Sequence, residues 1–147
     1  MIVLYANKHV IDCAADQPVR KGWAIEEHRN GGNLIWDAAQ VELYLSQSQK
    51  AGKWINGHEL RKKLVRKPVL NANVLDYLLV HQSLIPKEWK GKVVFFWGTI
   101  YRCDHIGACA CDLDVRFLSW GIDGWYSFWH HLDCGLEGNE PAALHAS

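Results

Sequence analysis

Val93-Val94-Phe95-Phe96-Trp97 is the first of three runs of β-branched and aromatic residues that decide the fold of this 147-residue chain. The other two runs are residues 115–120 and 125–132, and Gly121-Ile122-Asp123-Gly124 joins them. β-Branched and aromatic residues favour strands, and a short connection containing Gly and Asp is typical of a hairpin. The three runs therefore predict an antiparallel, aromatic-rich meander in the C-terminal half of the chain.

The first run is apolar on both faces of the strand that it predicts. One face would carry Val93, Phe95 and Trp97, and the other Val94, Phe96 and Ile100. Successive side chains of a strand point to opposite faces, so this strand would be buried on both sides. We expect it in the centre of the sheet.

Several shorter strands are predicted before the meander. Residues 23–28 alternate as a half-exposed strand does, and Asn30-Gly31-Gly32-Asn33 is a clear turn signal. The apolar residues near the N-terminus, 2–5 and 10–11, favour one bent strand or two short strands. Residues 40–46 are ambiguous: their alternation favours a strand, but a helix with Asp37 as its N-cap also fits.

Two helices are predicted between the early and the late strands. Residues 58–64 form a short basic helix that ends before Pro68. Asn71 is a good N-cap for a second helix over residues 72–82, which has apolar residues at helical spacing. Residues 133–147 are interpreted as an acidic, glycine-rich tail. Together the elements predict a single α+β domain spanning residues 1–147.

Charge is distributed unevenly along a chain whose formal net charge is zero. Residues 51–92 carry nine Lys and Arg against three acidic residues, whereas residues 93–147 carry two against seven. The two segments either give the molecule a polarised surface or face and neutralise each other, and composition does not separate these alternatives.

Composition also indicates the cellular compartment in which the protein resides. Five cysteines is an odd number, there is no Asn-X-Ser/Thr acceptor, and no apolar region of a secretory signal opens the chain. The longest strictly apolar run is about five residues, far below the ~20 that span a bilayer. These features predict a cytoplasmic protein with free thiols and no membrane association.

Three phrases in the chain resemble a family of short bacterial proteins of uncharacterised function. They are Pro68-Val69-Leu70-Asn71-Ala72-Asn73-Val74-Leu75-Asp76-Tyr77-Leu78-Leu79, Ile85-Pro86-Lys87-Glu88-Trp89-Lys90-Gly91 and Phe95-Phe96-Trp97-Gly98-Thr99-Ile100-Tyr101-Arg102. The ending Pro141-Ala142-Ala143-Leu144 is also similar. The resemblance covers most of the chain and implies no activity.

The chain departs from that family after Tyr101-Arg102, where the family has a brief Asp/Gly turn. Here the segment contains four potential zinc ligands: Cys103, His105, Cys109 and Cys111. Thiolates and imidazole bind zinc well, but common sites use two separated pairs of ligands. Free thiols in a hairpin loop are therefore the favoured interpretation, and no metal or other cofactor is predicted.

His130, His131 and Asp133 suggest a catalytic alternative. A histidine beside a carboxylate is a general base, and the nearby Cys134 is a potential nucleophile. Adjacent histidines on a strand face opposite ways, however, and no oxyanion element or nucleophile motif accompanies them. A small enzyme is accordingly the third-ranked interpretation, and no residue is assigned as catalytic.

A basic cluster suggests a second alternative, binding of single-stranded nucleic acid. It comprises Arg61, Lys62, Lys63, Arg66 and Lys67, and Trp54 and Trp89 flank it in sequence. Cationic side chains neutralise phosphates, and exposed aromatic rings stack on unpaired bases. The alternative interpretation is that these residues form an ordinary basic helix face in contact with solvent.

The leading interpretation is a non-enzymatic binding module that uses the aromatic face of its sheet. The predicted binding residues are Trp97, Tyr101, Arg102, Trp120, Trp125 and Trp129. Large aromatic rings form either a binding surface or the core, and the sequence leaves both open. The ligand is a protein or a small molecule, and a homodimer joined through a sheet edge is compatible with the pattern.

Overall fold

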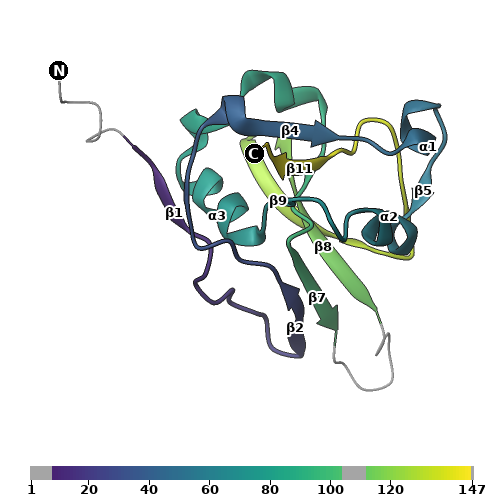
Figure 1. The fold of residues 1–147 in the computed structure, drawn as a ribbon, viewed down its shortest axis with the longest axis horizontal. Coiled ribbons are helices and arrows are strands. Elements are labelled where there is room, and N and C mark those ends of the chain that lie inside the picture. Colours follow the sequence, from purple (N-terminus) through teal and green to yellow (C-terminus); the bar gives the residue numbers. More distant parts are fainter. Residues whose placement is uncertain (1–7, 104–111, 147) are drawn as a thin grey trace.

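A computed structural model describes residues 8–103 and 112–146, and these form the predicted α+β fold (Figure 1). The strands are β1 (Val10–Asp12), β2 (Trp23–His28), β3 (Asn33–Ile35), β4 (Val41–Tyr44), β5 (Ile55–Asn56), β6 (Val94–Phe95), β7 (Thr99–Cys103), β8 (Leu113–Gly121), β9 (Gly124–His131), β10 (Gly135–Leu136) and β11 (Ala142–His145). The helices are α1 (Gln47–Lys50), α2 (Gly57–Lys63) and α3 (Ala72–Val80), with 3-10 turns η2 (Ala38–Gln40), η3 (Gln82–Leu84) and η4 (Lys87–Gly91).

The main sheet is built around β8. One edge of β8 pairs with β9 along its length, while the other pairs first with β7 and then with β6. The strand order is β2-β7-β8-β6-β11-β4, with β9 on the far side of β8. All these pairs are antiparallel except β6 with β11. Two small antiparallel pairs, β1–β3 and β5–β10, lie outside this sheet.

The first strand of the predicted meander is interrupted at Trp97-Gly98 and appears as β6 and β7, both antiparallel to β8. Val94 and Tyr101 are seven positions apart in the chain, whereas their partners Leu118 and Asp114 are only four positions apart. The two separations differ by three positions, which is an odd number. Each residue of β7 therefore points to the face opposite to the one that unbroken alternation from β6 would give it. Ile100 therefore packs with Phe95, and the prediction that it shares a face with Val94 is wrong.

The sheet is buried on both faces near β6. On one face, Val74, Leu75 and Leu78 of α3 pack with Val94 and Leu118. On the other, a second cluster joins α2 to the sheet through Leu60, Leu64, Phe95, Trp97 and Val115. The two helices accordingly lie on opposite sides of the strands (Figure 1). The central position predicted for the first strand is confirmed.

Local capping defines both predicted helices. The Asn71 side chain accepts a hydrogen bond from the Asn73 backbone at 3.0 Å, as expected for the N-cap of α3. Asn56 caps α2 in the same way through the backbone of His58. None of the described helices has the length and apolar character that crossing a lipid bilayer requires.

The interpretation of residues 133–147 as a tail is wrong. β10 lies within this segment, and β11 is inserted between β4 and β6 with Ala142, Ala143 and Leu144 buried. The apolar run is only three residues long, so its burial depends on strands that are distant in sequence. Residues 40–46 contain β4, and Asp37 caps the 3-10 turn η2 that precedes it.

Candidate ligand-binding site

A cavity of about 310 Å³ lies on the α3 side of the sheet, where the segment after β1 crosses the strands. Its walls come from this segment, from α3 and from four neighbouring strands. The lining residues are Gln17, Pro18, Val19, Arg20, Trp23, Asp76, Tyr101, Arg116 and Trp129.

Strand register brings the aromatic walls of the cavity together. Arg116 of β8 is directly opposite Trp129 of β9, and Tyr101 of β7 is opposite Asp114, two residues before Arg116. Trp23 of β2 is opposite Cys103, two residues beyond Tyr101. Residues directly opposite or two apart share a face, so the four lining side chains of the strands lie on one face.

A closed ring of polar contacts connects the elements around this cavity. Arg116 donates from Nη2 to Asp76 Oδ1 at 2.8 Å, and Gln17 donates from Nε2 to Asp76 Oδ2 at 2.9 Å. The Tyr101 hydroxyl donates to Gln17 Oε1 at 2.7 Å and also interacts with Arg116, which completes the ring. The hydrogen bond to Asp76 connects Gln17 to α3. A second hydrogen bond, from Gln17 Nε2 to Asn73 Oδ1 at 2.7 Å, adds to this connection.

The ring sets the protonation of its members. Burial would lower the pKa of Arg116, but the hydrogen bond and charge of Asp76 outweigh burial and raise it. Burial raises the pKa of Tyr101, although Arg116 partly opposes this effect. At neutral pH, Arg116 is therefore a cation and Tyr101 a neutral hydroxyl.

A second arginine is held against the aromatic rings. The Arg20 guanidinium carbon lies 4.4 Å from the centroid of the Trp23 ring and 4.1 Å from that of Trp129. The centroids of these two rings are 6.4 Å apart, and Tyr101 meets Trp129 edge-on at the same separation. Arg116 also lies over Trp129, at 5.4 Å. The site thus combines two cations with three aromatic rings.

Only two of the six predicted binding residues, Tyr101 and Trp129, line this cavity. Trp97 and Trp125 are buried, with 2% and 9% of their surfaces exposed, and both belong to the core clusters. Arg102 points to the opposite face from Tyr101, and its Nη1 lies 2.8 Å from Glu26. Trp120 is exposed, and Lys90 lies 4.0 Å from its ring centroid.

The residues that sequence reasoning missed come from elsewhere in the chain. Gln17 and Arg20 lie in an irregular segment, and Asp76 is a polar position of α3. Gln17 and Asp76 are 59 positions apart, so no local pattern relates them. Arg116, by contrast, was visible in the sequence as a basic residue beside the aromatic residues of its strand, on which it can stack.

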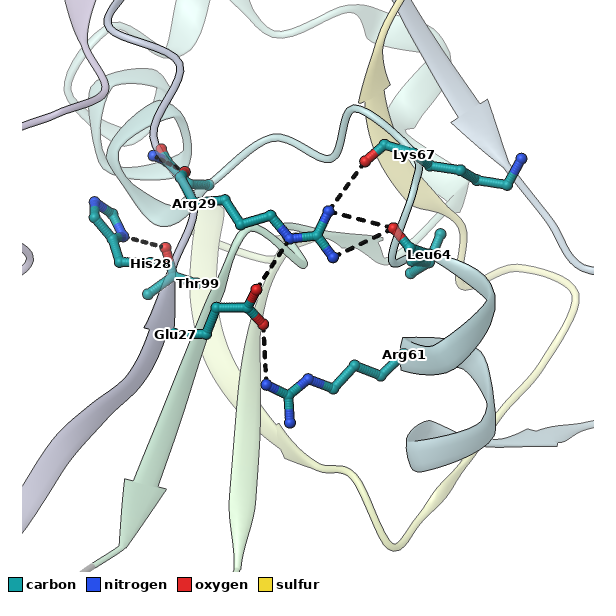
Figure 2. A network of polar contacts seen from close by, with 8 residues as sticks. Glu27, His28, Arg29, Arg61, Leu64, Lys67 and Thr99 are labelled. Carbon is teal, nitrogen blue, oxygen red and sulfur yellow. Dashed lines mark hydrogen bonds and ion pairs between the residues drawn. The ribbon is translucent and has the colours of Figure 1, made fainter.

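One side chain of the predicted basic cluster, Arg61, is engaged within the protein (Figure 2). Arg61 pairs with Glu27 at 2.9 Å, and the same carboxylate accepts from Arg29 at 3.2 Å. Arg29 donates to the carbonyls of Leu64 and Lys67, which satisfies acceptors at the end of α2. Burial would raise the pKa of Glu27, but the hydrogen bonds and charges of Arg61 and Arg29 lower it.

The remaining basic residues are more accessible. Lys62 is 3.4 Å from Glu59, its i−3 neighbour on the exposed side of α2, and Lys63 and Arg66 are exposed. The Lys67 ammonium lies 4.6 Å from the centroid of the Tyr44 ring. Of the two flanking tryptophans, Trp54 is 65% exposed and Trp89 is buried.

The three residues of the catalytic alternative have different partners. Asp133 pairs with His58, at 2.8 Å, and His131 pairs with Asp114, at 2.5 Å. His130 packs edge-on against the Phe95 ring. Asp114 is 1% exposed, and burial raises its pKa despite the opposing charge and hydrogen bond of His131.

Of the four potential zinc ligands, the structure describes Cys103 alone, and this thiol is buried. His105, Cys109 and Cys111 lie outside the described residues. Within residues 8–103 and 112–146, no three His, Cys, Asp or Glu side chains are grouped closely enough to hold a metal ion.

A second cavity, of about 390 Å³, lies between the β2–β3 turn and residues 67–71. The guanidinium at its wall, that of Arg29, is engaged by Glu27 and by backbone carbonyls. Burial, with a smaller effect of the Asp12 charge, raises the pKa of the Cys13 thiol at its wall. That thiol is therefore protonated at neutral pH and is a poor nucleophile.

Comparison with protein-family models, with curated proteins and with solved structures gives no match for this chain. The cavity beside Arg116 therefore provides the structural basis for assigning a function.

Proposed function

We propose that this protein is a small, non-enzymatic binding module whose ligand site is the cavity on the aromatic sheet face. The observation that carries the proposal is the closed polar ring of Arg116, Asp76, Gln17 and Tyr101 beside that cavity. Buried ion pairs are often no more stabilising than apolar side chains of similar volume. A ring that holds an irregular segment over aromatic walls is better suited to shaping a binding site.

The size and lining of the cavity support a small ligand. Pockets for small molecules usually occupy about 300–1,000 Å³ and combine aromatic walls with a few convergent polar groups. At about 310 Å³, this cavity is at the lower limit. Three aromatic rings and two guanidinium groups supply the expected mixture of surfaces.

The same lining favours binding over catalysis. None of the nine described residues around the cavity is Ser, Cys, His or Lys. Both carboxylate oxygens of Asp76 accept hydrogen bonds within the ring, and burial keeps the Tyr101 hydroxyl protonated. These groups are therefore arranged to position a ligand and not to exchange protons with it.

Indole N–H signals in two-dimensional NMR provide a direct test, because Trp23 and Trp129 line the cavity. Trp→Phe variants assign the signals, and a small-molecule library is then added to the unmodified protein. We expect ligands that shift the Trp23 and Trp129 signals and lose affinity in Trp129→Ala. Trp120→Ala is the matched control, because Trp120 is exposed outside the cavity. Shifts confined to Trp54 and Trp120 would contradict the proposal.

A second candidate function is the binding of single-stranded nucleic acid by the end of α2. It is favoured by the exposure of Lys63 and Arg66, and of Lys62 beside them, because exposed cations attract phosphates. Fluorescence anisotropy with labelled RNA and DNA at low salt and at about 0.2 M salt tests it. Replacing Lys62, Lys63 and Arg66 with Glu should abolish binding, and unchanged binding would exclude this surface.

A further inference from the structure

We propose that the ligand of the cavity beside Arg116 carries an anionic oxyacid group, a carboxylate or a phosphate, and that Arg20 binds this group. The inference rests on the proposed function of the cavity and specifies the class of ligand that it takes. Three features support it: the orientation of Arg20, the charges around Arg20, and a hydrogen-bond donor in a residue of the same wall.

The Arg20 guanidinium is held against two aromatic rings, but no acidic side chain of the described residues forms an ion pair with it. Its guanidinium carbon lies within 4.4 Å of two ring centroids, those of Trp23 and Trp129. A guanidinium stacked on an aromatic face keeps its N–H groups in its own plane, where they donate in pairs to carboxylate or phosphate. No carboxylate among the residues that the structure describes lies within 4.0 Å of Arg20. Its donors therefore lie in one plane, and no carboxylate of the described residues pairs with them.

The other two charged side chains that line the cavity are paired with each other. Arg116 and Asp76 neutralise each other, and Gln17 donates a hydrogen bond to the second carboxylate oxygen of Asp76. Asp114 is close enough for Arg20 to lower its pKa slightly against the effect of burial, but its direct partner is His131. Among the described residues that line the cavity, the charge that remains for a ligand is the positive charge of Arg20.

Trp129, which lines the same wall, carries a hydrogen-bond donor without a described partner. Its indole N–H is buried and has no acceptor among the described residues. Buried donors are normally satisfied, so an unsatisfied one in a residue that lines the cavity favours a ligand that brings an acceptor. An oxyacid group supplies acceptors only, which suits both this donor and the guanidinium.

The aromatic rings by themselves also resemble a cage for a cationic ligand. Here, however, the cation between Trp23 and Trp129 is the protein's own Arg20. A cationic ligand would have to displace it and then lie near Arg116, whose guanidinium is 5.4 Å from the Trp129 centroid. The geometry therefore favours an anion.

Four probes of similar size distinguish the ligand classes: benzoate, phenyl phosphate, neutral benzamide and cationic benzyltrimethylammonium. Each is titrated against the full chain, and the Trp23 and Trp129 indole N–H signals report binding. We expect at least one anion to bind about tenfold or more tightly than benzamide, as a hydrogen bond to a charged group implies. The tighter of the two anions identifies the oxyacid as a carboxylate or a phosphate.

Variants of Arg20 test its role directly. Arg20→Gln should remove the preference for the anion, and Arg20→Lys should retain part of it, because charge remains while the planar donor pair is lost. Lys21→Gln is the matched control, since Lys21 is exposed, adjacent in sequence and outside the cavity lining. Arg20 is itself exposed, so these variants should fold, and near-UV circular dichroism verifies this.

The outcomes separate this inference from the proposed function. Equal binding of benzoate, phenyl phosphate and benzamide, or unchanged anion binding by Arg20→Gln, would overturn the inference and leave the cavity as a binding site. Preferential binding of benzyltrimethylammonium, strengthened in Arg20→Gln, would identify a cation cage instead. If none of the probes shifts Trp23 or Trp129, the proposed function itself is contradicted.

Discussion

The Arg116 guanidinium donates to the Asp76 carboxylate at 2.8 Å, which joins the central strand β8 to helix α3 beside the cavity. The Arg116 side chain is 11% exposed and that of Asp76 is 40% exposed, so the arginine depends more on the pair than the aspartate does. Removing the carboxylate would leave a buried cation without its anion.

Asp76→Asn should accordingly lower the free energy of unfolding by about 2 kcal/mol, the scale for a hydrogen bond to a charged group. Urea denaturation measures this difference. Asp123→Asn is the control, because Asp123 is exposed in the β8–β9 turn and its replacement should change stability by less than about 0.5 kcal/mol. Identical unfolding midpoints for the two variants would show that the Arg116–Asp76 pair does not stabilise the fold.

Glu27 should make the protein less stable in acid. Burial alone would raise its pKa, but Arg61 and Arg29 lower it below the usual 4.5. The folded state therefore binds fewer protons than the unfolded state, and the stabilisation present above about pH 4.5 is lost as the pH falls through the folded pKa. In thermal unfolding between pH 2.5 and 7, Glu27→Gln should differ most from the unmodified protein at neutral pH. A constant difference across this range would contradict the prediction.

Asp114 should have the opposite effect. Burial raises its pKa above 3.8, so the stability associated with the protonated form is lost as the pH rises through the folded pKa. Asp114→Asn is therefore expected to raise the melting temperature at pH 7, and the gain should disappear in acid. A lower melting temperature at pH 7 would mean that the contact with His131 outweighs the cost of burying the charge.

Trp125 and Phe128 should respond differently to truncation although both lie on β9. Trp125 is buried in the core cluster under α3, whereas Phe128 is 60% exposed. Trp125→Ala should destabilise the fold by about 3–5 kcal/mol, and Phe128→Ala by less than about 1 kcal/mol. Chemical denaturation distinguishes the two, and comparable losses would place Phe128 in a buried contact of equal importance.

Features that depend on neighbouring residues were predictable from the sequence. The range of β2, the cap of α3 and the antiparallel meander all follow from side-chain alternation, helical spacing or an asparagine beside a helix. β11 was not predictable, because a run as short as Ala142-Ala143-Leu144 becomes a strand only where β4 and β6 leave a place for it.

The binding site likewise contains residues that the sequence indicated and residues that only the tertiary structure brought together. The sequence by itself identified Tyr101 and Trp129 as candidates, since large aromatic residues in strands are visible without a structure. Their meeting depends on the three-residue register difference at Trp97-Gly98; unbroken alternation would have placed Tyr101 on the face of Phe95. The tertiary structure also brought Gln17 and Arg20 over the sheet, because hydrogen bonds from Gln17 to Asn73 and Asp76, 56 and 59 residues away, hold their segment. Such contacts form when distant surfaces pack together, and no pattern of adjacent residues encodes them.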